Sequence, residues 1–529
     1  MNLIKDGWIP ASRSDGSVCF IAPWEIGKSD NPVTEIKAPR PDFRGALYQF
    51  LIGLVQTTFS PEEEEDWTDY WGNIPSCDEL KNAFEKYADA FELYSENGPA
   101  FMQDFHLPDS AVENTISSLL IDAPGGNTVV LNKDHFVKRD TVRCMCPSCA
   151  ATALFTLQTN APSGGQGNRT GMRGGGPLTT LVMPDSVENL WQKIWLNVLP
   201  RAGLSDSSLP DVRDSSVFPW LAETRESCND EKVYPSDVNI LQQFWGMPRR
   251  IRLAKSSEQG ICDVCGRKGD LYVSYSAKNY GISYSSTWHH VLSPYRKQVE
   301  KDGTESLLAL KGKQGGLTYT DWMPLTLFSS FDTNSAQMAD VVSAFCFFKM
   351  KFEPFAGTGW HIWCFGYDME NMKARCWYDQ KMPIFFVPDD MRNKYIETMQ
   401  KVSTAATDCA RTLQSQVKAA WSDNPKDIKG DVSFIEAAFY AETESMFYKT
   451  ADTILKQVSG KQGGLEKNVS LELQHWRKYI IRKVNELFDR FALQDTDVTA
   501  NMKRVVHAAK LLGIYLNKDK AIEQLKEEA

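Results

Sequence analysis

The sequence lacks any apolar run of 18 residues or more, so we expect no membrane-spanning helix. We also expect no secretory signal, because an acid and a tryptophan occur in the opening MNLIKDGWIP before an apolar core can form. Both absences favour a cytoplasmic protein. In that compartment the twelve cysteines are expected to be free or metal-bound rather than disulfide-linked.

An excess of positive charge is missing as well. The formal net charge is −10, with 68 acidic residues against 58 lysines and arginines, whereas proteins that bind free duplex alone are usually basic. This balance argues against an independent nucleic-acid-binding protein. It leaves open local basic patches, or a subunit whose neighbours in a complex carry the positive charge.

Signatures of the common catalytic and nucleotide-binding sites are absent. Only seven histidines are available as general bases, and no Ser/His/Asp order or paired carboxylate motif stands out. Neither a P-loop nor a Rossmann fingerprint is found. The H-x-E motif of zinc deaminases is missing, because Phe136 and Val137 follow His135. We interpret the adjacent His289 and His290 as surface histidines, since neighbouring side chains diverge in a helix or a strand.

At 529 residues the chain is longer than one hydrophobic core usually serves, so we expect two or three domains. Residues 1–385 are predicted to form a large mixed α/β domain. Apolar spacing predicts a helix over Asp42–Phe59, and the acidic run Glu62–Asp66 is typical of a solvated helix start. Short β-like runs lack regular alternation with helices, which disfavours a doubly wound sheet. These runs are Thr128–Leu131, Leu271–Tyr275, Thr318–Tyr319 and Ala344–Phe348.

Residues 386–529 contain four segments in which apolar residues recur at steps of three and four. They predict a four-helix bundle, which makes the fold class α+β. Ser433 and Glu436 form a capping-box pattern for the second segment, and Gly460–Gly464 separates it from the third. The fourth segment is expected to bury Met502, Val506, Ala509, Leu512 and Leu516. Basic residues on the last two segments indicate either a solvated face or a surface for a nucleic-acid strand or partner subunit; they are Arg477, Lys478, Arg482, Lys483, Arg490, Lys503, Arg504 and Lys510.

Two CxxC pairs, Cys146 with Cys149 and Cys262 with Cys265, carry the clearest metal-binding pattern. Each turn can direct two thiolates at one tetrahedral Zn²⁺, so together they complete a structural Cys₄ site that staples distant parts of one domain. Two unrelated thiol pairs are the alternative. Cys144 lies close in sequence but need not be a ligand.

The stretch Ala161–Val182, APSGGQGNRTGMRGGGPLTTLV, has seven glycines among 22 residues, with Arg169 and Arg173 between them. Glycine permits positive φ and close backbone approach, and bare N–H groups beside arginines suit phosphate oxygens or base edges. The stretch therefore indicates a nucleic-acid surface. Weaker basic segments are Lys138–Arg139 with Arg143, Arg249–Arg250 with Arg252, and Lys373 with Arg375.

These segments together resemble the large-subunit family, CasA, of the type I-E CRISPR surveillance complex called Cascade. The resemblance runs through most of the chain and includes MNLIKDGWIP, CPSCAATALF, the Ala161–Val182 stretch, WGMPRRIRL at Trp245–Leu253, CDVCG, FGYDMENMKARCWYD at Phe365–Asp379, and the C-terminal helices. It implies a non-enzymatic subunit that reads the protospacer-adjacent motif of duplex DNA from the minor groove. Such a subunit promotes strand separation and R-loop formation, and then recruits a helicase–nuclease for antiviral defence.

The resemblance also implies site residues by position. The family's glycine loop falls on Ser163, Gly164, Gly165, Gln166 and Gly167, with Gln166 where a glycine can stand. The remaining Arg169–Thr180 half is then expected to support the shape and packing of the loop. The family's lysine finger falls on Lys278 or Asn279, and its wedge, which splits the first base pair, falls on Asn371 with Met372 beside it.

The implied partners are guide crRNA, target double-stranded DNA, the backbone, small and 5′-handle-capping Cascade subunits, and the helicase–nuclease. The loop Leu131–Arg143 matches a family loop that docks on the neighbouring subunit and the guide RNA 5′ handle; its phosphate-binding candidates are Lys133, Lys138, Arg139 and Arg143. The family's zinc pattern matches the four CxxC cysteines.

Two alternatives remain: a zinc-dependent enzyme acting on a nucleotide or nucleic acid, and a bundle protein that binds only other proteins. Missing H-x-E and H-E-x-x-H motifs disfavour the enzyme.

Overall fold

A computed structural model describes residues 1–124, 141–186, 189–204, 208–255, 258–299, 303, 305–328, 336–351, 359–370, 373–459, 465–493 and 501–526. The chain divides into two compact units. The first comprises residues 1–314 and 329–381, and the second comprises residues 315–328 and 382–529. Among the described residues, no helix has both the length and the apolar character needed to span a bilayer.

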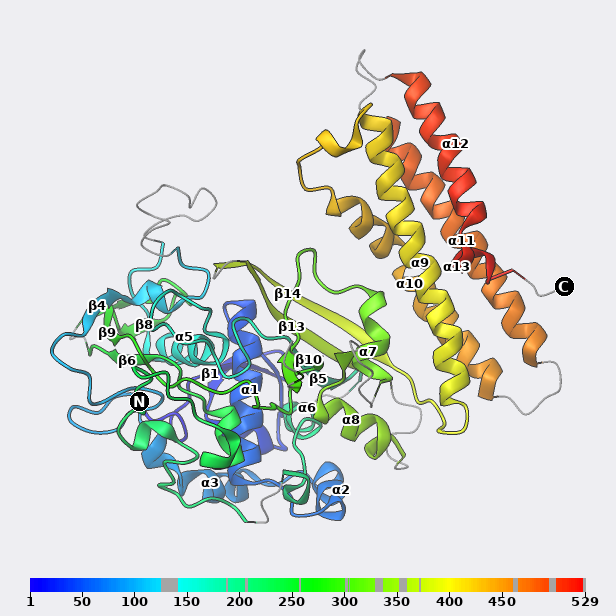
Figure 1. The fold of residues 1–529 in the computed structure, drawn as a ribbon. Helices are drawn as coiled ribbons and strands as arrows, with labels where there is room; N and C mark the ends of the chain where they lie inside the picture. The colour runs from blue at the N-terminus through cyan, green and yellow to red at the C-terminus, as the bar shows by residue number, and fades with distance from the viewer. Residues whose placement is uncertain are drawn as a thin grey trace. The chain divides into compact units, whose positions relative to one another are not determined.

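Helix α1 (Pro41–Thr58) forms the centre of the first unit and confirms the helix predicted from Asp42 (Figure 1). Pro41 occupies the first helical position, where its fixed φ and missing N–H are tolerated. The ring of Phe50 is surrounded edge-to-face by Trp8, Phe155 and Trp245, with centroids 5.2, 5.7 and 5.9 Å away. Almost every side of α1 is buried, so it is a core helix rather than an amphipathic surface helix.

Shorter helices and small antiparallel sheets pack around α1. In the described part of this unit, the other α-helices are α2 (Glu64–Gly72), α3 (Cys77–Glu85), α5 (Pro147–Asn160), α6 (Leu190–Trp195) and α8 (Asp340–Phe347). Three strand sets, in spatial order, are β2 (Val18–Ile21), β1 (Ile9–Arg13) and β3 (Val33–Ile36); β4 (Val112–Thr115), β9 (Ser274–Lys278) and β6 (Arg250–Leu253); and the pair β7 (Gln259–Ile261) and β8 (Lys268–Asp270). Two further sets are β11 (Glu305–Ala309), β10 (Tyr295–Val299) and β12 (Ala336–Gln337); and β14 (Lys373–Ile384), β13 (Trp360–Glu370) and β5 (Thr179–Pro184).

The predictions of short strands were mostly wrong. Ala344–Phe348 lies largely in helix α8, which buries Val341, Val342 and Phe345 at helical spacing. Thr318–Tyr319 begins a 3₁₀ turn, and strand β9 starts only at Ser274. Thr128–Leu131 lies outside the described residues. Short apolar runs fit a strand or a buried helix equally well, and tertiary packing decides between them. The acidic run was correctly predicted as a helix start, because α2 begins at Glu64.

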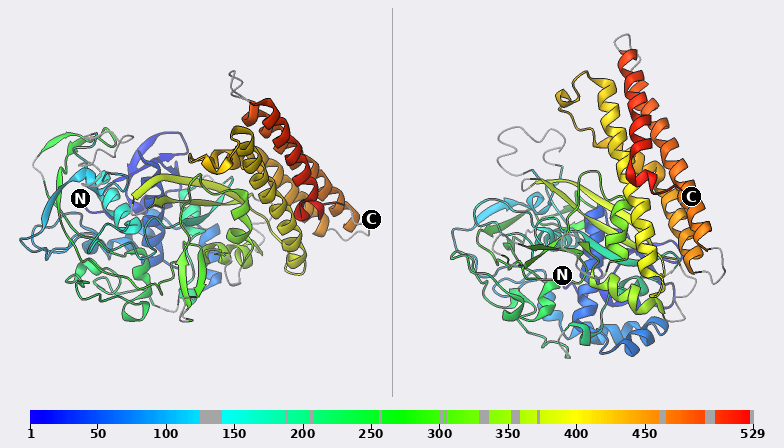
Figure 2. Two further views of the ribbon diagram at one scale, coloured as in Figure 1. Left: turned by 45° about the horizontal axis from the view of Figure 1, so that its top comes forward. Right: turned by 45° about the vertical axis from the view of Figure 1, so that its right-hand side comes forward.

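The second unit is a bundle of four long helices, which lie side by side in all views (Figures 1 and 2). They are α9 (Arg392–Trp421), α10 (Ser433–Ser459), α11 (Leu465–Leu493) and α12 (Met502–Lys518), with the short α7 (Trp322–Thr326) and α13 (Lys520–Glu523) beside them. Buried side chains form hydrogen bonds between the helices. For example, the Trp476 indole N–H on α11 donates to the Val402 carbonyl on α9 at 3.1 Å. The predicted α+β class with a C-terminal bundle is confirmed.

Two details of the bundle differ from prediction. Ser433 is the first residue of α10 rather than the residue before it, and its N–H donates to Asp431 Oδ1 at 2.9 Å. On α12 the buried face carries Val505 and Ala508, which lie next to the predicted positions. Three residues predicted as core are exposed instead: Met502, Val506 and Ala509. Counting back from Leu512, a step of four leads to Ala508 and a step of three leads to Ala509. Both steps are helical, so spacing alone did not decide which of the two is buried.

Candidate nucleic-acid interface and cysteine cluster

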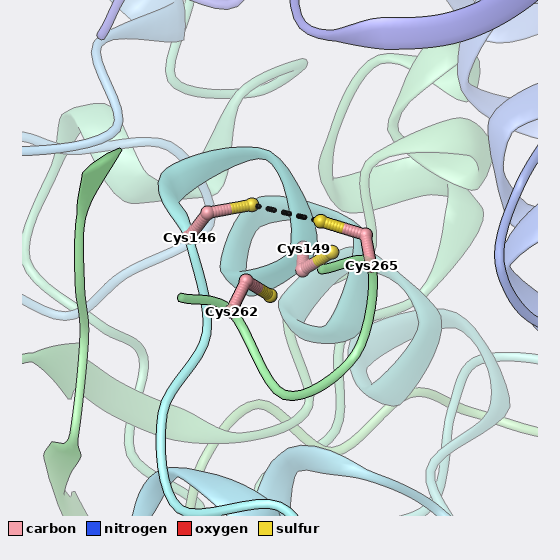
Figure 3. A group of neighbouring side chains, drawn as sticks. All are labelled: Cys146, Cys149, Cys262 and Cys265. Carbon is pink, nitrogen blue, oxygen red and sulfur yellow. Dashed lines mark hydrogen bonds between the residues drawn. The ribbon is translucent and has the colours of Figure 1, made fainter. Parts of the chain in front are cut away.

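Four cysteines from two distant segments meet in the first unit (Figure 3). Cys146 is the N-cap of α5 and Cys149 lies in its first turn, so the start of the helix presents both thiols. Cys262 follows β7, and Gly266 closes the tight turn after Cys265. Its φ is +73°, and its N–H donates to the Cys262 carbonyl at 2.8 Å. The two CxxC pairs thus form one cluster, as predicted.

The dimensions of the cluster fit a tetrahedral metal ion. The four Sγ atoms lie within 4.8 Å of one another, and Cys146 Sγ is 3.6 Å from Cys265 Sγ. Thiolates bound to Zn²⁺ at about 2.3 Å would lie about 3.8 Å apart. Hydrogen bonds from the Cys146 and Cys149 thiols hold the pKa of Cys262 well below its usual range. The cluster therefore already favours a thiolate, the form that binds zinc.

Asp263, inside the second CxxC turn, fixes the backbone just before the first CxxC pair. Its Oδ2 accepts the backbone N–H groups of Arg143 and Cys144 at 2.7 and 3.0 Å. These bonds lower the pKa of Asp263, and the bond from Arg143 has the largest effect. Cys144 is therefore fixed beside the cluster through its backbone, while its thiol lies outside the group of four.

Replacing Asp263 with alanine should free residues 143–144 without emptying the cysteine cluster. A hydrogen bond to a charged group contributes about 1.5–3 kcal/mol, so the exchange of the Arg143 and Cys144 amides should accelerate by about tenfold or more. Hydrogen–deuterium exchange measures this directly. Asp270→Ala, which removes a carboxylate from β8 of the same hairpin, is the matched control. Unchanged exchange in Asp263→Ala would mean that other contacts hold this segment.

The predicted glycine loop, residues 163–167, lies on the surface after α5. Its residues from Ser163 to Gln166 are exposed. Gly165 and Gly167 have φ values of +89° and +74°, which L side chains rarely adopt. A Cβ added at Gly167 would come within 2.8 Å of Asn279 Cβ, whereas one at Gly165 would meet open space. Gly167 is therefore required for close packing, and Gly165 for backbone conformation.

The structure brings the glycine loop and the predicted lysine-finger segment together. Asn279 Nδ2 donates to the Gln166 carbonyl at 2.9 Å, and the Tyr280 N–H donates to the Gly167 carbonyl at 2.7 Å. Lys278, at the end of β9, donates from Nζ to Ser110 Oγ at 3.0 Å. Asn279 thus contacts the glycine loop directly, whereas the Lys278 side chain binds Ser110.

Arg249 and Asn168 support the loop from its inner side. Arg249 donates from Nη1 to Asn168 Oδ1 at 2.5 Å and from Nη2 to the Pro162 carbonyl. Asn168 Nδ2 in turn donates to the Gly164 carbonyl at 2.7 Å. Burial lowers the pKa of Arg249 to about 10, which still leaves it charged at neutral pH. The exposed loop is therefore held by a chain of hydrogen bonds beneath it.

Other arginines considered for nucleic-acid contact also bind protein groups. Arg250 is buried and forms an ion pair with Asp104 at 2.6 Å. Arg169 Nε donates to Ser227 Oγ at 2.7 Å. Arg173 is buried as well, which agrees with a packing role for the second half of the glycine-rich stretch.

The predicted wedge residues, Asn371 and Met372, lie outside the described residues. They fall between β13 and β14, which are neighbours in one sheet. Arg375 on β14 binds both carboxylate oxygens of Asp368 on β13 at 2.8 and 2.9 Å, and Glu370 at 2.5 Å. This bidentate pair joins the two strands close to the predicted wedge.

The second half of the glycine-rich stretch lies against β13. A Cβ at Gly176, whose φ is +60°, would come 2.7 Å from Met369 Cγ. The stretch then continues into β5, which pairs with β13 from Thr179 opposite Phe365 to Pro184 opposite Trp360. A single run of chain therefore connects the glycine loop with β5 and, through strand pairing, with β13, which precedes the predicted wedge in sequence.

The sequence matches the model of a known protein family over most of its length. The family model for CRISPR-associated protein Cse1 matches residues 2–487. The chain belongs to the Cse1 family. Solved Cse1-family structures share its fold. CasA of Thermus thermophilus has 17% identity and a TM-score of 0.65, covering 98% of this chain and 99% of its own. Cse1 of Acidimicrobium ferrooxidans has 15% identity and a TM-score of 0.70, covering 100% and 99%.

A further match is a chain in a solved CRISPR RNA-guided surveillance complex. It has 14% identity and a TM-score of 0.67, and the match covers 98% of this chain and 99% of that chain. At such low identities the structural matches show the fold alone.

In this Cse1-family chain, the predicted partner loop is described only at its C-terminal end. Lys133, Lys138 and Arg139 lie outside the described residues. Arg143 is exposed, and its backbone is fixed by Asp263. The cysteine cluster and the end of this loop are therefore connected through Asp263.

Four of the eight basic residues named for the bundle are paired with acids in this Cse1-family chain, and Arg504 is one of them, 3.1 Å from Asp423. Lys483 lies 2.8 Å from Glu486 and 3.5 Å from Glu442, and Arg490 lies 2.5 Å from Glu442. Arg482 lies 3.6 Å from Glu486. Of the two interpretations of this basic side, the pairing favours a solvated face.

Sequence reasoning misplaced one histidine of this Cse1-family chain. His290, expected on the surface, is buried, and its Nδ1 accepts the Leu292 N–H at 3.1 Å. His289 is half-buried and lies 3.3 Å from Asp340. The two side chains do diverge, as expected, but one of them enters the core.

Proposed function

We propose that the chain is the large subunit of a CRISPR RNA-guided surveillance complex and reads a short motif beside the target in duplex DNA. The glycine loop, Ser163–Gly167, approaches the minor groove, where a degenerate code requires only a few polar groups. The observation that carries this proposal is an exposed loop held rigidly by Asn279 and Arg249. Family membership and the fold shared with a chain of a solved surveillance complex support it.

Within the proposed site, Lys278 and Gln166 would meet the DNA while Asn279 shapes the loop. Lys278 supplies a positive charge suited to phosphate. The exposed Gln166 carries an amide that can donate to or accept from base edges.

The cysteine cluster is proposed to hold a structural Zn²⁺, ligated by Cys146, Cys149, Cys262 and Cys265. Zinc would supply a cross-link between the start of α5 and the β7–β8 hairpin. Four protein thiolates leave no open position for water, whereas a catalytic zinc keeps one. The donor set therefore supports a non-enzymatic subunit over the alternative of a zinc-dependent enzyme acting on nucleic acid.

The partners proposed for this subunit are guide RNA, target duplex, the other subunits of the complex and a recruited helicase–nuclease. The loop ending at Arg143 is proposed to dock on the neighbouring subunit and the guide RNA 5′ handle. Because the chain carries a net charge of −10, neighbouring subunits would supply most of the attraction to DNA. Alone, the chain should bind duplex weakly and with little sequence preference.

Replacing Asn371 and Met372 together with alanine tests the proposed wedge. The double variant should slow strand opening, because no side chain would then stack on the first unpaired base. Base stacking on a side chain contributes about 1–3 kcal/mol, so motif-dependent duplex binding by the assembled complex should weaken about five-fold or more. Electrophoretic shifts on intact and pre-opened duplexes measure this. The pre-opened duplex should bind the variant normally. Unchanged binding to intact duplex would remove the wedge assignment.

A further inference from the structure

Arg173, in the middle of the glycine-rich stretch, is a buried guanidinium whose hydrogen-bond partners are all neutral. Its exposed fraction is only 6%. It donates from Nη1 to Thr179 Oγ1 at 3.0 Å and to Ser293 Oγ at 2.9 Å, and from Nη2 to Gln49 Oε1 at 2.6 Å. Arginine is almost never fully buried unless it is paired with an acid. Within the described part of the chain, no carboxylate contacts Arg173.

The neutral partners are themselves fixed. Gln49 Nε2 donates to the Gly45 carbonyl and Ser293 Oγ donates to the Leu178 carbonyl, so their free lone pairs face Arg173. Burial raises the pKa of the neighbouring Tyr295 to about 12, so that phenol carries no charge at neutral pH. Burial lowers the pKa of Arg173 only to about 10. The guanidinium therefore remains charged, and an uncompensated buried charge costs several kcal/mol.

A small cavity lies beside this charge, lined by Arg173, His290, Gln49, Gln158, Gln243 and Phe244 among others. His290 is buried, and its Nδ1 accepts the Leu292 N–H, so the proton of the neutral ring is on Nε2. Over the described residues, neither this Nε2–H nor the Arg173 Nε–H has an acceptor. The cavity has room for one or two guests of the size of water.

We propose that this cavity binds a small inorganic anion of the size of chloride, held by the Arg173 guanidinium and the Nε2–H of His290. A water molecule would satisfy the free donors but would leave the buried charge uncompensated, whereas an anion does both. The residues that line the cavity come from α1, α5, the glycine-rich stretch, residues 243–246 and His290. Anion binding would therefore join these segments of the first unit. The site is separate from residues 163–167 and does not depend on their proposed role.

Bromide replaces chloride at such sites and can be located by its anomalous scattering. A crystal of the full chain soaked in bromide should give a peak within hydrogen-bonding distance of both Arg173 and His290 Nε2. In solution, replacing chloride by gluconate at constant ionic strength should lower the melting temperature. The shift should saturate with chloride concentration, as ligand linkage requires. A cavity that holds only water, without an anomalous peak, would overturn the proposal.

Arg173→Gln removes the charge while keeping hydrogen-bonding capacity. The variant should lose the chloride-dependent change in melting temperature. Arg169→Gln, in the same glycine-rich stretch but bonded to Ser227, is the matched control and should keep it. A chloride effect of equal size in Arg173→Gln would also overturn the proposal. If that variant does not fold, the bromide peak in the unmodified chain decides the question alone.

Discussion

Replacing Cys149 with serine is expected to abolish binding of the proposed Zn²⁺ and to destabilise the first unit strongly. Cys149 is buried in the first turn of α5, and its thiol belongs to the group of four. Zinc binding is coupled to folding, and its free energy in small zinc domains is about 10–16 kcal/mol. Loss of one ligand should therefore lower the free energy of unfolding by more than about 4 kcal/mol, a size seen only when a core, network or metal site is broken.

Cys144→Ser is the matched control for this prediction. Cys144 lies two residues before Cys146 but outside the cluster, so its variant should keep one equivalent of zinc and nearly unchanged stability. Metal content after dialysis and the midpoint of chemical unfolding measure both effects. Full metal content in Cys149→Ser, or equal loss in both variants, would contradict a Cys₄ site made by the two CxxC pairs.

Replacing Gly167 with alanine should displace the glycine loop and abolish most motif-dependent DNA binding. The new Cβ would lie 2.8 Å from Asn279 Cβ at a φ of +74°. The left-handed conformation alone costs an alanine about 1–2 kcal/mol, and the clash adds to that. The loop can relieve both only by moving away from Asn279, so the affinity of the assembled complex for duplex with the motif should fall at least about tenfold.

Gly203→Ala provides the control, because a Cβ there meets open space and its φ is not in the left-handed region. Gly165→Ala should have an intermediate effect, since its backbone is strained at +89° but its Cβ meets nothing. Affinities are compared at one salt concentration on duplexes that differ only in the motif. Equal affinity of Gly167→Ala and Gly203→Ala for the motif duplex would show that the loop does not read DNA.

The sequence predicted local features better than the contacts between them. The CxxC spacing identified four cysteines that do cluster, because each pair lies on one turn and thiols have few other roles at that spacing. Helical spacing of apolar residues found α1 and the four bundle helices, since such spacing is reliable over long segments, although α1 proved to be buried on almost every side. Short apolar runs did not predict strands correctly. Ala344–Phe348, for example, is largely helical because its neighbours bury one helical face.

The support of the glycine loop could not have been predicted from the sequence. Asn168 and Arg249 are 81 residues apart, and their hydrogen bond depends on the tertiary fold. The arginine-rich run at Arg249 and Arg250 looked like a basic patch, yet both side chains turn inward to bind protein acceptors. The sequence shows that a side chain is charged, but not the direction in which it points. Only the fold decides whether an arginine meets solvent, a carbonyl or an acid.

We propose above all that this chain makes a surveillance complex depend on a motif in duplex DNA. The most direct measurement compares complexes assembled on one guide RNA with the unmodified chain, with Gly167→Ala, or without the chain. Each is tested on target duplexes with an intact or an altered motif. We predict that only the complex with the unmodified chain binds the intact-motif duplex more tightly than the altered one. Equal motif preference in the complex that lacks the chain would contradict the account.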